Sequence, residues 1–218
     1  NCKSAVVGIS GGLDSTLALI VTAKAFDMLG IPRKNIECVT MPCFGTTDRT
    51  YQNACMMTEK LGATLTEVNI KDAVRTHFRD IGQSEDNHDV TFENAQARER
   101  TQVLMDIANM KNGMVIGTCD MSELALGWAT YNGDHMSMYG VNGGIPKTLI
   151  RVLVNWVATN GEVDADASAA LLDVLDTPIS PELLPPDASG KINQKTEDLV
   201  GPYELHDFFL YHILHNAY

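Results

Sequence analysis

The first third of the chain alternates between short apolar runs and longer segments with helical spacing. Residues 5–9 (AVVGI) are continuously apolar and rich in β-branched side chains, which is typical of a strand buried on both faces. After Gly12 the apolar positions follow the period of a helix, and Gly30 and Pro32 end it. The pattern therefore predicts a strand, a tight glycine loop and a helix in succession.

The same alternation continues to residue 118 and predicts the fold class. Further strands are predicted at 36–41, 64–68 and 114–118, and further helices at 48–61 and 92–110. Strands separated by helices of this length predict an α/β fold with a doubly wound parallel sheet and helices on both faces. Ligands of such sheets bind where the strand order reverses, so the loops after Ile9, Met41 and Thr118 are the expected site.

Beyond Asp120 the pattern changes to helices and turns, so the C-terminal part is predicted to be helical. A polar, proline-rich stretch at residues 178–198 interrupts it. A flexible linker is one interpretation of this stretch. Its apolar residues Ile179, Leu183 and Leu184 favour the other, an ordered loop at the active site.

Size and charge narrow the class of protein. With 218 residues, 44% of them apolar, the chain is expected to form one domain over residues 1–218. A net charge of −12 leaves no diffuse basic surface for nucleic acid or an anionic membrane. No apolar run reaches the roughly 20 residues of a membrane span, and no signal peptide is recognisable, so we expect a cytoplasmic protein.

Cysteine and histidine give little support for a metal or disulfide site. The five cysteines are scattered and contain no C-x-x-C pair, which predicts reduced thiols. His212 and His215 are spaced like metal ligands on a helix, but no acidic or cysteine partner completes a site. Their aromatic neighbours are expected in the core or at a subunit interface. Because the sequence starts at Asn1 without methionine and stops at Tyr218 after this helical pattern, we expect a piece of a longer protein.

The segment Ser10-Gly11-Gly12-Leu13-Asp14-Ser15-Thr16 carries the first chemistry. Two glycines allow backbone N–H groups to approach an anion, and the helix start and the hydroxyl groups add donors, so the segment predicts a phosphate-binding loop. It lacks the lysine of the Walker A pattern. Asp14 would repel a phosphate unless a cation intervened, which makes it a candidate Mg²⁺ ligand. A tight turn capped by serine is the alternative.

A second segment, Gly117-Thr118-Cys119-Asp120-Met121-Ser122-Glu123-Leu124-Ala125-Leu126-Gly127-Trp128, begins where a strand ends. Asp120 or Ser122 can cap the helix that follows, and Glu123 falls in its first turn, facing the strand ends. Without further context, an acid complementing the helix dipole is the favoured interpretation of Glu123.

Together these segments carry a family resemblance. The string SGGLDST resembles the pyrophosphate-binding loop of the N-type ATP pyrophosphatases, which adenylate a substrate and release pyrophosphate. The second segment, followed by TYNGDHMSMYGVNGGIPKT at residues 130–148, closely resembles the synthetase domain of glutamine-dependent NAD synthetases. GMP synthetases share the first loop and not the second block. The resemblance covers essentially the whole chain.

The resemblance implies a role for each matching residue. Asp14 and Glu123 would hold Mg²⁺, and together with Lys147 they would be the catalytic residues. The expected ATP-binding residues are Ser10, Gly11, Gly12, Asp14, Ser15, Thr40, Met41, Thr118, Lys147 and Ser180. Asn94, Arg98 and Asp134 are expected to bind the nicotinate dinucleotide. Ordinary packing, turn formation or a solvated charged face remain the alternatives for Thr40, Met41, Ser180 and Arg98.

Lys147 follows Pro146 at a predicted helix start, where a cation is disfavoured by the helix dipole. A bound anion would remove the conflict, so we expect a phosphate ligand there. On this interpretation Lys147→Ala lowers turnover and leaves the stability of the unliganded protein nearly unchanged.

The implied reaction starts with attack of the nicotinate carboxylate on the α-phosphorus of ATP. Ammonia then displaces AMP to give the amide, with Mg²⁺ as cofactor and a separate glutaminase domain as the source of ammonia. A homo-oligomer is expected. Another adenylating amidotransferase, such as a GMP synthetase, and a catalytically silent nucleotide-binding module remain as alternatives. Two features depart from the family: Tyr131 stands where ammonia-only members carry lysine, and the family continues past Tyr218.

Overall fold

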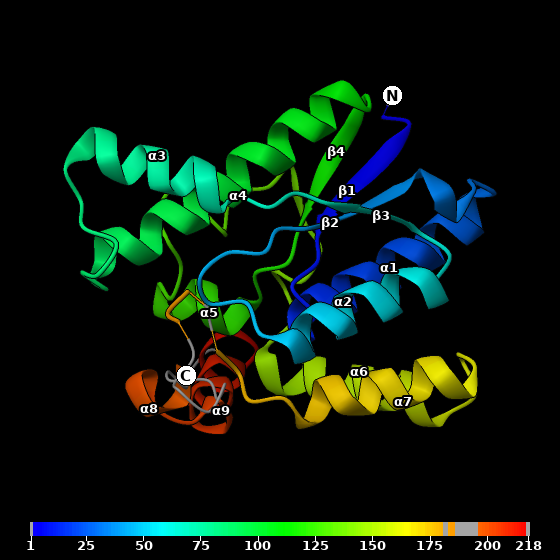
Figure 1. Cartoon of the computed structure of the whole chain (residues 1–218). Coiled ribbons are helices and arrows are strands. Elements are labelled where there is room, and N and C mark those ends of the chain that lie inside the picture. Colours follow the sequence, from blue (N-terminus) through cyan, green and yellow to red (C-terminus); the bar gives the residue numbers. More distant parts are fainter. Residues whose placement is uncertain (1, 181–182, 186–195, 217–218) are drawn as a thin grey trace.

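A five-stranded, all-parallel sheet forms the centre of the protein (Figure 1). The computed structural model describes residues 2–180, 183–185 and 196–216. The strands, in the order β3-β2-β1-β4-β5, are Thr64–Glu67, Ile36–Thr40, Ser4–Gly8, Gly113–Gly117 and Tyr139–Gly140. The doubly wound parallel sheet predicted from the sequence is confirmed.

Helices cover both faces of the sheet. Below the sheet in Figure 1 lie α1 (Leu13–Leu29), α2 (Asp48–Lys60), α6 (Lys147–Thr159) and α7 (Ala165–Asp176). Above it lie α3 (Lys71–Ile81) and α4 (Val90–Met110). A short 3₁₀ turn, η1 (Arg33–Asn35), precedes β2, and α5 (Met121–Leu126), α8 (Thr196–Val200) and α9 (Tyr203–Leu214) complete the described chain.

The central strands send alternate side chains into two separate cores. Ala5 and Val7 of β1 pack with α1, α2, α6 and α7, whereas Val6 packs with α3 and α4. This alternation is the period of two of a strand, with both faces apolar because both are covered. It explains why the sequence shows a continuous apolar run.

Two elements differ from the sequence-based expectation. Helix α3 is absent from the predicted pattern, although Val74 and Phe78 lie four residues apart and both enter the upper core. Strand β5 has only two residues, too few for a periodic signal.

The proline-rich stretch is described only at 178–180, 183–185 and 196–198, so most of that prediction lies outside the described residues. No helix among the described residues is long and apolar enough to span a membrane.

The order of the strands places the site. The chain moves outward from β1 to β2 and β3, then returns past β1 to β4 on its other side. The carboxyl ends of β1 and β4 therefore lie side by side with their following loops diverging, which is the switch point at which ligands bind in sheets of this kind. Asn142 bridges these loops: its Nδ2 donates to the carbonyl oxygens of Asp14 and Thr118, both at 2.9 Å.

Candidate active site

The loop between β1 and α1 is tightly constrained. Ser10 and Ser15 face each other across it with their Oγ atoms 3.1 Å apart, and Gly12 N donates to Ser10 Oγ at 3.1 Å. Gly11 has a φ of +82°, and a Cβ there would lie 1.9 Å from the carbonyl oxygen of Thr50. Only glycine fits at this position. Since no described side chain caps α1, the start of the helix stays open to an anion.

Three carboxylates meet one lysine beside this loop. Lys147 is the first residue of α6, and its Nζ donates to Asp14 Oδ2 at 2.6 Å and to Glu123 Oε1 at 2.8 Å. Asp120 Oδ2 lies 3.0 Å from the same nitrogen. The side chains of Lys147 and Asp120 are 0% exposed. The cluster is a desolvated ion-pair network in which negative charge exceeds positive charge.

The sequence of α5 fixes two of these acids. Asp120 is the N-cap: its Oδ1 accepts from Glu123 N at 2.7 Å, while Asp120 N donates to Glu123 Oε2 at 3.4 Å. This reciprocal pair is a capping box. Glu123, predicted as a first-turn acid, thus takes part in the cap through Oε2 and contacts Lys147 through Oε1. The sequence expectation did not include Asp120 in the site, although its potential as a cap was visible.

Burial controls the charge states of the cluster. It raises the pKa of Glu123 to about 7, and the negative charge of Asp14 adds to this effect while Lys147 opposes it. Burial also raises the pKa of Asp120. For Lys147, burial favours the neutral form, but the nearby acids outweigh it and raise the pKa. Lys147 therefore stays charged, and Glu123 is the acid that titrates near neutral pH.

The acidic part of the cluster fits a divalent cation. One carboxylate oxygen from each of Asp14, Asp120 and Glu123 lies within 4.8 Å of the other two. Among the described residues, no other group of three or more aspartate, glutamate, histidine or cysteine side chains is spaced closely enough to hold a metal ion. Asp14 Oδ1 is buried and has no described hydrogen-bond partner. Carboxylate oxygens are the ligands that Mg²⁺ prefers. His212 and His215 do not belong to this set.

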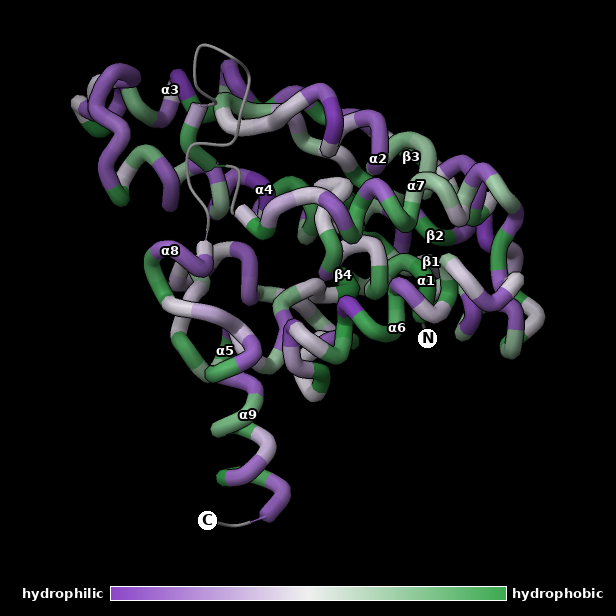
Figure 2. The backbone as a smooth tube through the Cα atoms, turned by 90° about the horizontal axis from the view of Figure 1, so that it is seen from below, coloured by the Kyte–Doolittle hydropathy of each residue, from purple (hydrophilic) through white to green (hydrophobic). Residues whose placement is uncertain are grey.

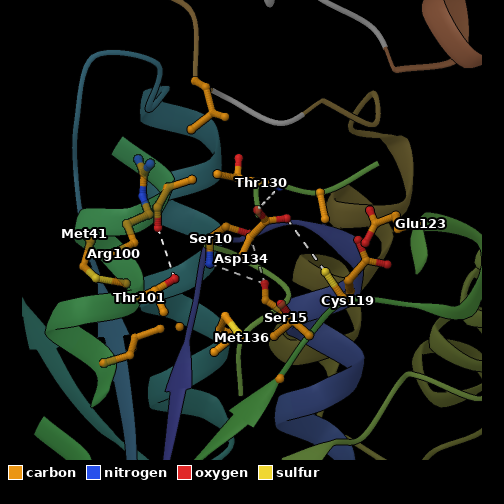
Figure 3. Close-up of a pocket in the computed structure, with 18 of the residues that line it drawn as sticks. Ser10, Ser15, Met41, Arg100, Thr101, Cys119, Glu123, Thr130, Asp134 and Met136 are labelled. Atoms are coloured by element: carbon orange, nitrogen blue, oxygen red, sulfur yellow. Dashed lines mark hydrogen bonds between the residues drawn. The ribbon is translucent and has the colours of Figure 1, made fainter. Parts of the chain in front are cut away.

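A cavity of about 550 Å³ opens at the carboxyl ends of the strands (Figure 3). It brings together most of the residues singled out in the sequence. The predicted site residues that line it are Ser10, Asp14, Ser15, Thr40, Met41, Asn94, Thr118, Glu123, Asp134 and Ser180. Gly11, Gly12, Arg98 and Lys147 do not line it. Lys147 is instead fully buried, and its Nζ pairs with the carboxylates of Asp14, Asp120 and Glu123.

Asn94 and Asp134 come together through a third residue. Thr130 Oγ1 donates to Asn94 Oδ1 at 2.8 Å, and Thr130 N donates to Asp134 Oδ1 at 2.7 Å. Helix α4 and the loop after α5 are joined in this way at one wall of the cavity. Cys119 also lies there, with its Sγ 3.8 Å from Asp134 Oδ2.

Helix α4 presents a different arginine to the cavity from the one expected. Arg98 is exposed, and its Nε donates to the carbonyl oxygen of Tyr131 at 3.1 Å. Arg100 lines the cavity (Figure 3). Residues two apart on a helix point about 200° apart, so only one of the two can face the cavity.

A family model described as NAD synthase matches residues 1–216. The chain belongs to the NAD synthase family. Curated relatives in this family include the glutamine-dependent NAD(+) synthetases of Mycobacterium leprae, 48% identical over 214 residues, and Aquifex aeolicus, 30% identical over 210 residues. The matches cover 96% and 95% of this chain, but only 31% and 34% of those relatives. The chain thus spans about a third of their length.

Two solved structures share the fold. The glutamine-dependent NAD+ synthetase of Acinetobacter baumannii, solved with ADP, is 25% identical, with a TM-score of 0.70 over 78% of this chain and 32% of that one. The NMN synthetase of Francisella tularensis is 24% identical, with a TM-score of 0.76 over 96% of this chain and 77% of that one. At that identity the second likeness shows the fold alone.

The burial of Lys147 changes the expected result of its removal. Lys147→Met leaves the carboxylates desolvated and unpaired, so the free energy of unfolding measured in EDTA should fall by about 3–5 kcal/mol. Lys24→Met removes the exposed ion pair with Glu162 and should cost less than about 1 kcal/mol. Urea unfolding of both variants tests this, and equal small losses would contradict the buried network.

The raised pKa of Glu123 predicts a pH dependence of stability. A folded-state pKa of about 7, above the unfolded value of 4.5, means that the folded protein holds the proton more tightly. Glu123 should therefore stabilise the protein less as the pH rises between these values. Urea unfolding from pH 4.5 to 8 in EDTA should show this loss in the wild type relative to Glu123→Gln, which keeps the shape of the cap. Parallel pH profiles would show that the pKa is not raised.

Proposed function

We propose that this chain catalyses the ATP-dependent amidation of nicotinic acid adenine dinucleotide to NAD. The observation that carries the proposal is the arrangement at the switch point, where an uncapped glycine loop, an acidic cluster and a 550 Å³ cavity meet. Membership of the NAD synthase family and the names of the curated relatives support the choice of substrate.

In this proposal Asp14 and Glu123 hold Mg²⁺, and the phosphates of ATP lie at the start of α1. Bound Mg²⁺ would neutralise the charge that develops on pyrophosphate as it leaves. The open amides of α1 and the hydroxyl groups of Ser10 and Ser15 would orient the phosphates. Thr40, Met41, Thr118 and Ser180 line the same cavity and are proposed to contact ATP.

The chain's own residues act by binding and orientation. The nicotinate carboxylate attacks the α-phosphorus, the bond to pyrophosphate breaks, and ammonia then attacks the acyl carbon and releases AMP. Neither step needs a side-chain nucleophile, so catalysis comes from placing the reactants and neutralising charge. Lys147 is proposed to complete the positive field under the phosphates. Its Nζ pairs with Asp14, Asp120 and Glu123, so Lys147 and a Mg²⁺ ion held by Asp14 and Glu123 would share these acids.

Ammonia is proposed to come from a glutaminase part of the longer protein. The relatives are named as glutamine-dependent, and two thirds of their length lies outside the match. Cys119 is the cysteine that lines the cavity, but burial raises the pKa of its thiol, with the charges of Glu123 and Asp134 adding to the effect. A protonated thiol is a poor nucleophile, which disfavours glutamine cleavage at this site.

Assembly into a homo-oligomer is also proposed. Helix α9 projects from the body of the protein in Figure 2. Several large side chains along it are more than half exposed, including Phe208, Phe209 and Tyr211. Contact with a second copy or with the rest of the longer protein would remove this apolar surface from water. A cytoplasmic location remains a prediction.

The proposed activity can be tested by pyrophosphate release with ATP, Mg²⁺ and ammonium. Nicotinic acid adenine dinucleotide should support turnover, whereas xanthosine monophosphate and nicotinic acid mononucleotide should not. Asp14→Asn should abolish release, because it removes a proposed metal ligand, while Asp48→Asn on the exposed start of α2 should not. Turnover with xanthosine monophosphate would favour a GMP synthetase, and no turnover with any acceptor would favour a silent module.

The two arginines of α4 are expected to affect different ligands. The family resemblance assigns Arg98 to the dinucleotide, and its bond to Tyr131 anchors the segment that carries Asp134. Arg98→Ala should raise KM for the dinucleotide, roughly tenfold for the loss of one charge-assisted contact. Arg100→Ala should mainly raise KM for ATP, because Arg100 lines the cavity beside Met41. Steady-state kinetics with each substrate varied in turn separate the two, and identical effects would contradict this division.

A further inference from the structure

The start of helix α6 lacks a cap of its own. Its N-cap residue is Pro146, whose side chain offers no acceptor, and no hydrogen bond from a side chain of that residue is present. The first amides of a helix need partners when they are buried. Lys147, whose Nζ enters the acidic cluster, is the first residue of this helix and is fully buried. The groups that accept hydrogen bonds from the first amides of α6 therefore also set the position of Lys147.

Two side chains from other elements supply the missing acceptors. Ser122 Oγ, on α5, accepts from Lys147 N at 2.9 Å. Asp207, on α9, accepts from Thr148 N through Oδ2 at 2.8 Å and from the hydroxyl group of Ser122 through Oδ1. Ser122 is 0% exposed and Asp207 is 7% exposed. A buried carboxylate thus closes a chain of hydrogen bonds that joins α5, α6 and α9.

A second residue of α9 supports the same contact. Tyr203 lies four residues before Asp207 and so shares its face of the helix. The centroid of the Tyr203 ring lies 5.4 Å from Lys147 Nζ, and the Tyr203 side chain is buried. Asp207 therefore fixes the backbone of Lys147 while Tyr203 packs against the end of its side chain. None of these contacts belongs to the cavity wall, because neither Tyr203 nor Asp207 lines it.

We infer that Asp207 is a positioning residue that holds Lys147 and Glu123 in register through Ser122. Ser122 immediately precedes Glu123 in the chain. The carboxylate of Asp207 therefore constrains both Lys147 and Glu123. The inference rests on the proposed function for its kinetic consequence, but its structural part concerns the acidic cluster alone. Helix α9, some 60 residues downstream of Lys147 in the chain, is on this account part of the active site's support.

Asp207→Asn tests the inference with little change in shape. The amide can still accept from Thr148 N, but its NH₂ group then faces Ser122 Oγ, whose proton loses its acceptor. Substitutions behind metal ligands typically cost roughly 10- to 100-fold in metal affinity or activity. We expect Mn²⁺ affinity, measured by electron paramagnetic resonance without nucleotide, to fall by about this factor, and kcat to fall with it. Ser122→Ala should change both in the same direction, and it serves as a second variant should Asp207→Asn not fold.

The control is Glu204→Gln, which removes an exposed carboxylate from the same helix and should leave Mn²⁺ affinity, kcat and Tm unchanged. All variants are made in the intact protein, with Tm measured alongside. Wild-type Mn²⁺ affinity and kcat in both test variants would overturn the inference, as would a loss of Tm large enough to account for the lost activity. If the wild type binds Mn²⁺ but releases no pyrophosphate, the proposed function is refuted. The role of Asp207 is then decided by the Mn²⁺ affinities of the variants alone.

Discussion

The ion-pair network around Lys147 is the constraint on which the site depends. One buried ammonium faces three acids that come from α1 and α5, while the lysine itself starts α6. Desolvated charges are tolerated only when their geometry is nearly fixed. The loops after β1 and β4, joined by Asn142, must therefore keep their relative positions, and the parallel sheet beneath them provides this rigidity.

This network also explains how an acidic protein can accommodate anionic ligands. The charged residues that line the described cavity are four acids, Asp14, Glu93, Glu123 and Asp134, and a single base, Arg100. The two polyanionic substrates proposed for this chain, ATP and nicotinic acid adenine dinucleotide, would be repelled by such a wall without added cations. Three groups would make the local field positive. They are a divalent ion on the acidic cluster, the open start of α1 and the side chain of Lys147. The overall charge of −12 and phosphate binding are thus compatible.

The sequence predicted what depends on local pattern and missed what depends on distant contacts. The alternation of short apolar runs with helical segments, together with the glycine pair, was enough to predict the parallel sheet and the loop at its switch point. Helix α3 carries an amphipathic pattern, with Val74 and Phe78 on one face, that the sequence analysis overlooked, whereas strand β5 has only two residues and is too short for a periodic signal. The partners of Lys147 could not be predicted, because Asp14 lies 133 residues away in the chain. Arg100, and not Arg98, lines the cavity because of the rotation of α4, which packing fixes, and the assignment of Arg98 to the dinucleotide stays a prediction.

Glu123 shows why a residue's structural and functional interpretations need not compete. A first-turn acid that caps a helix is an ordinary stabilising feature, and Oε2 of Glu123 performs that role by accepting from Asp120 N. Its other oxygen, Oε1, accepts from Lys147. The cap restricts the rotation of the carboxylate, so the second oxygen points into the cluster, where it meets Lys147. The interaction that stabilises α5 is therefore also the one that aims the proposed metal ligand, and a substitution that disrupts the cap would disturb both.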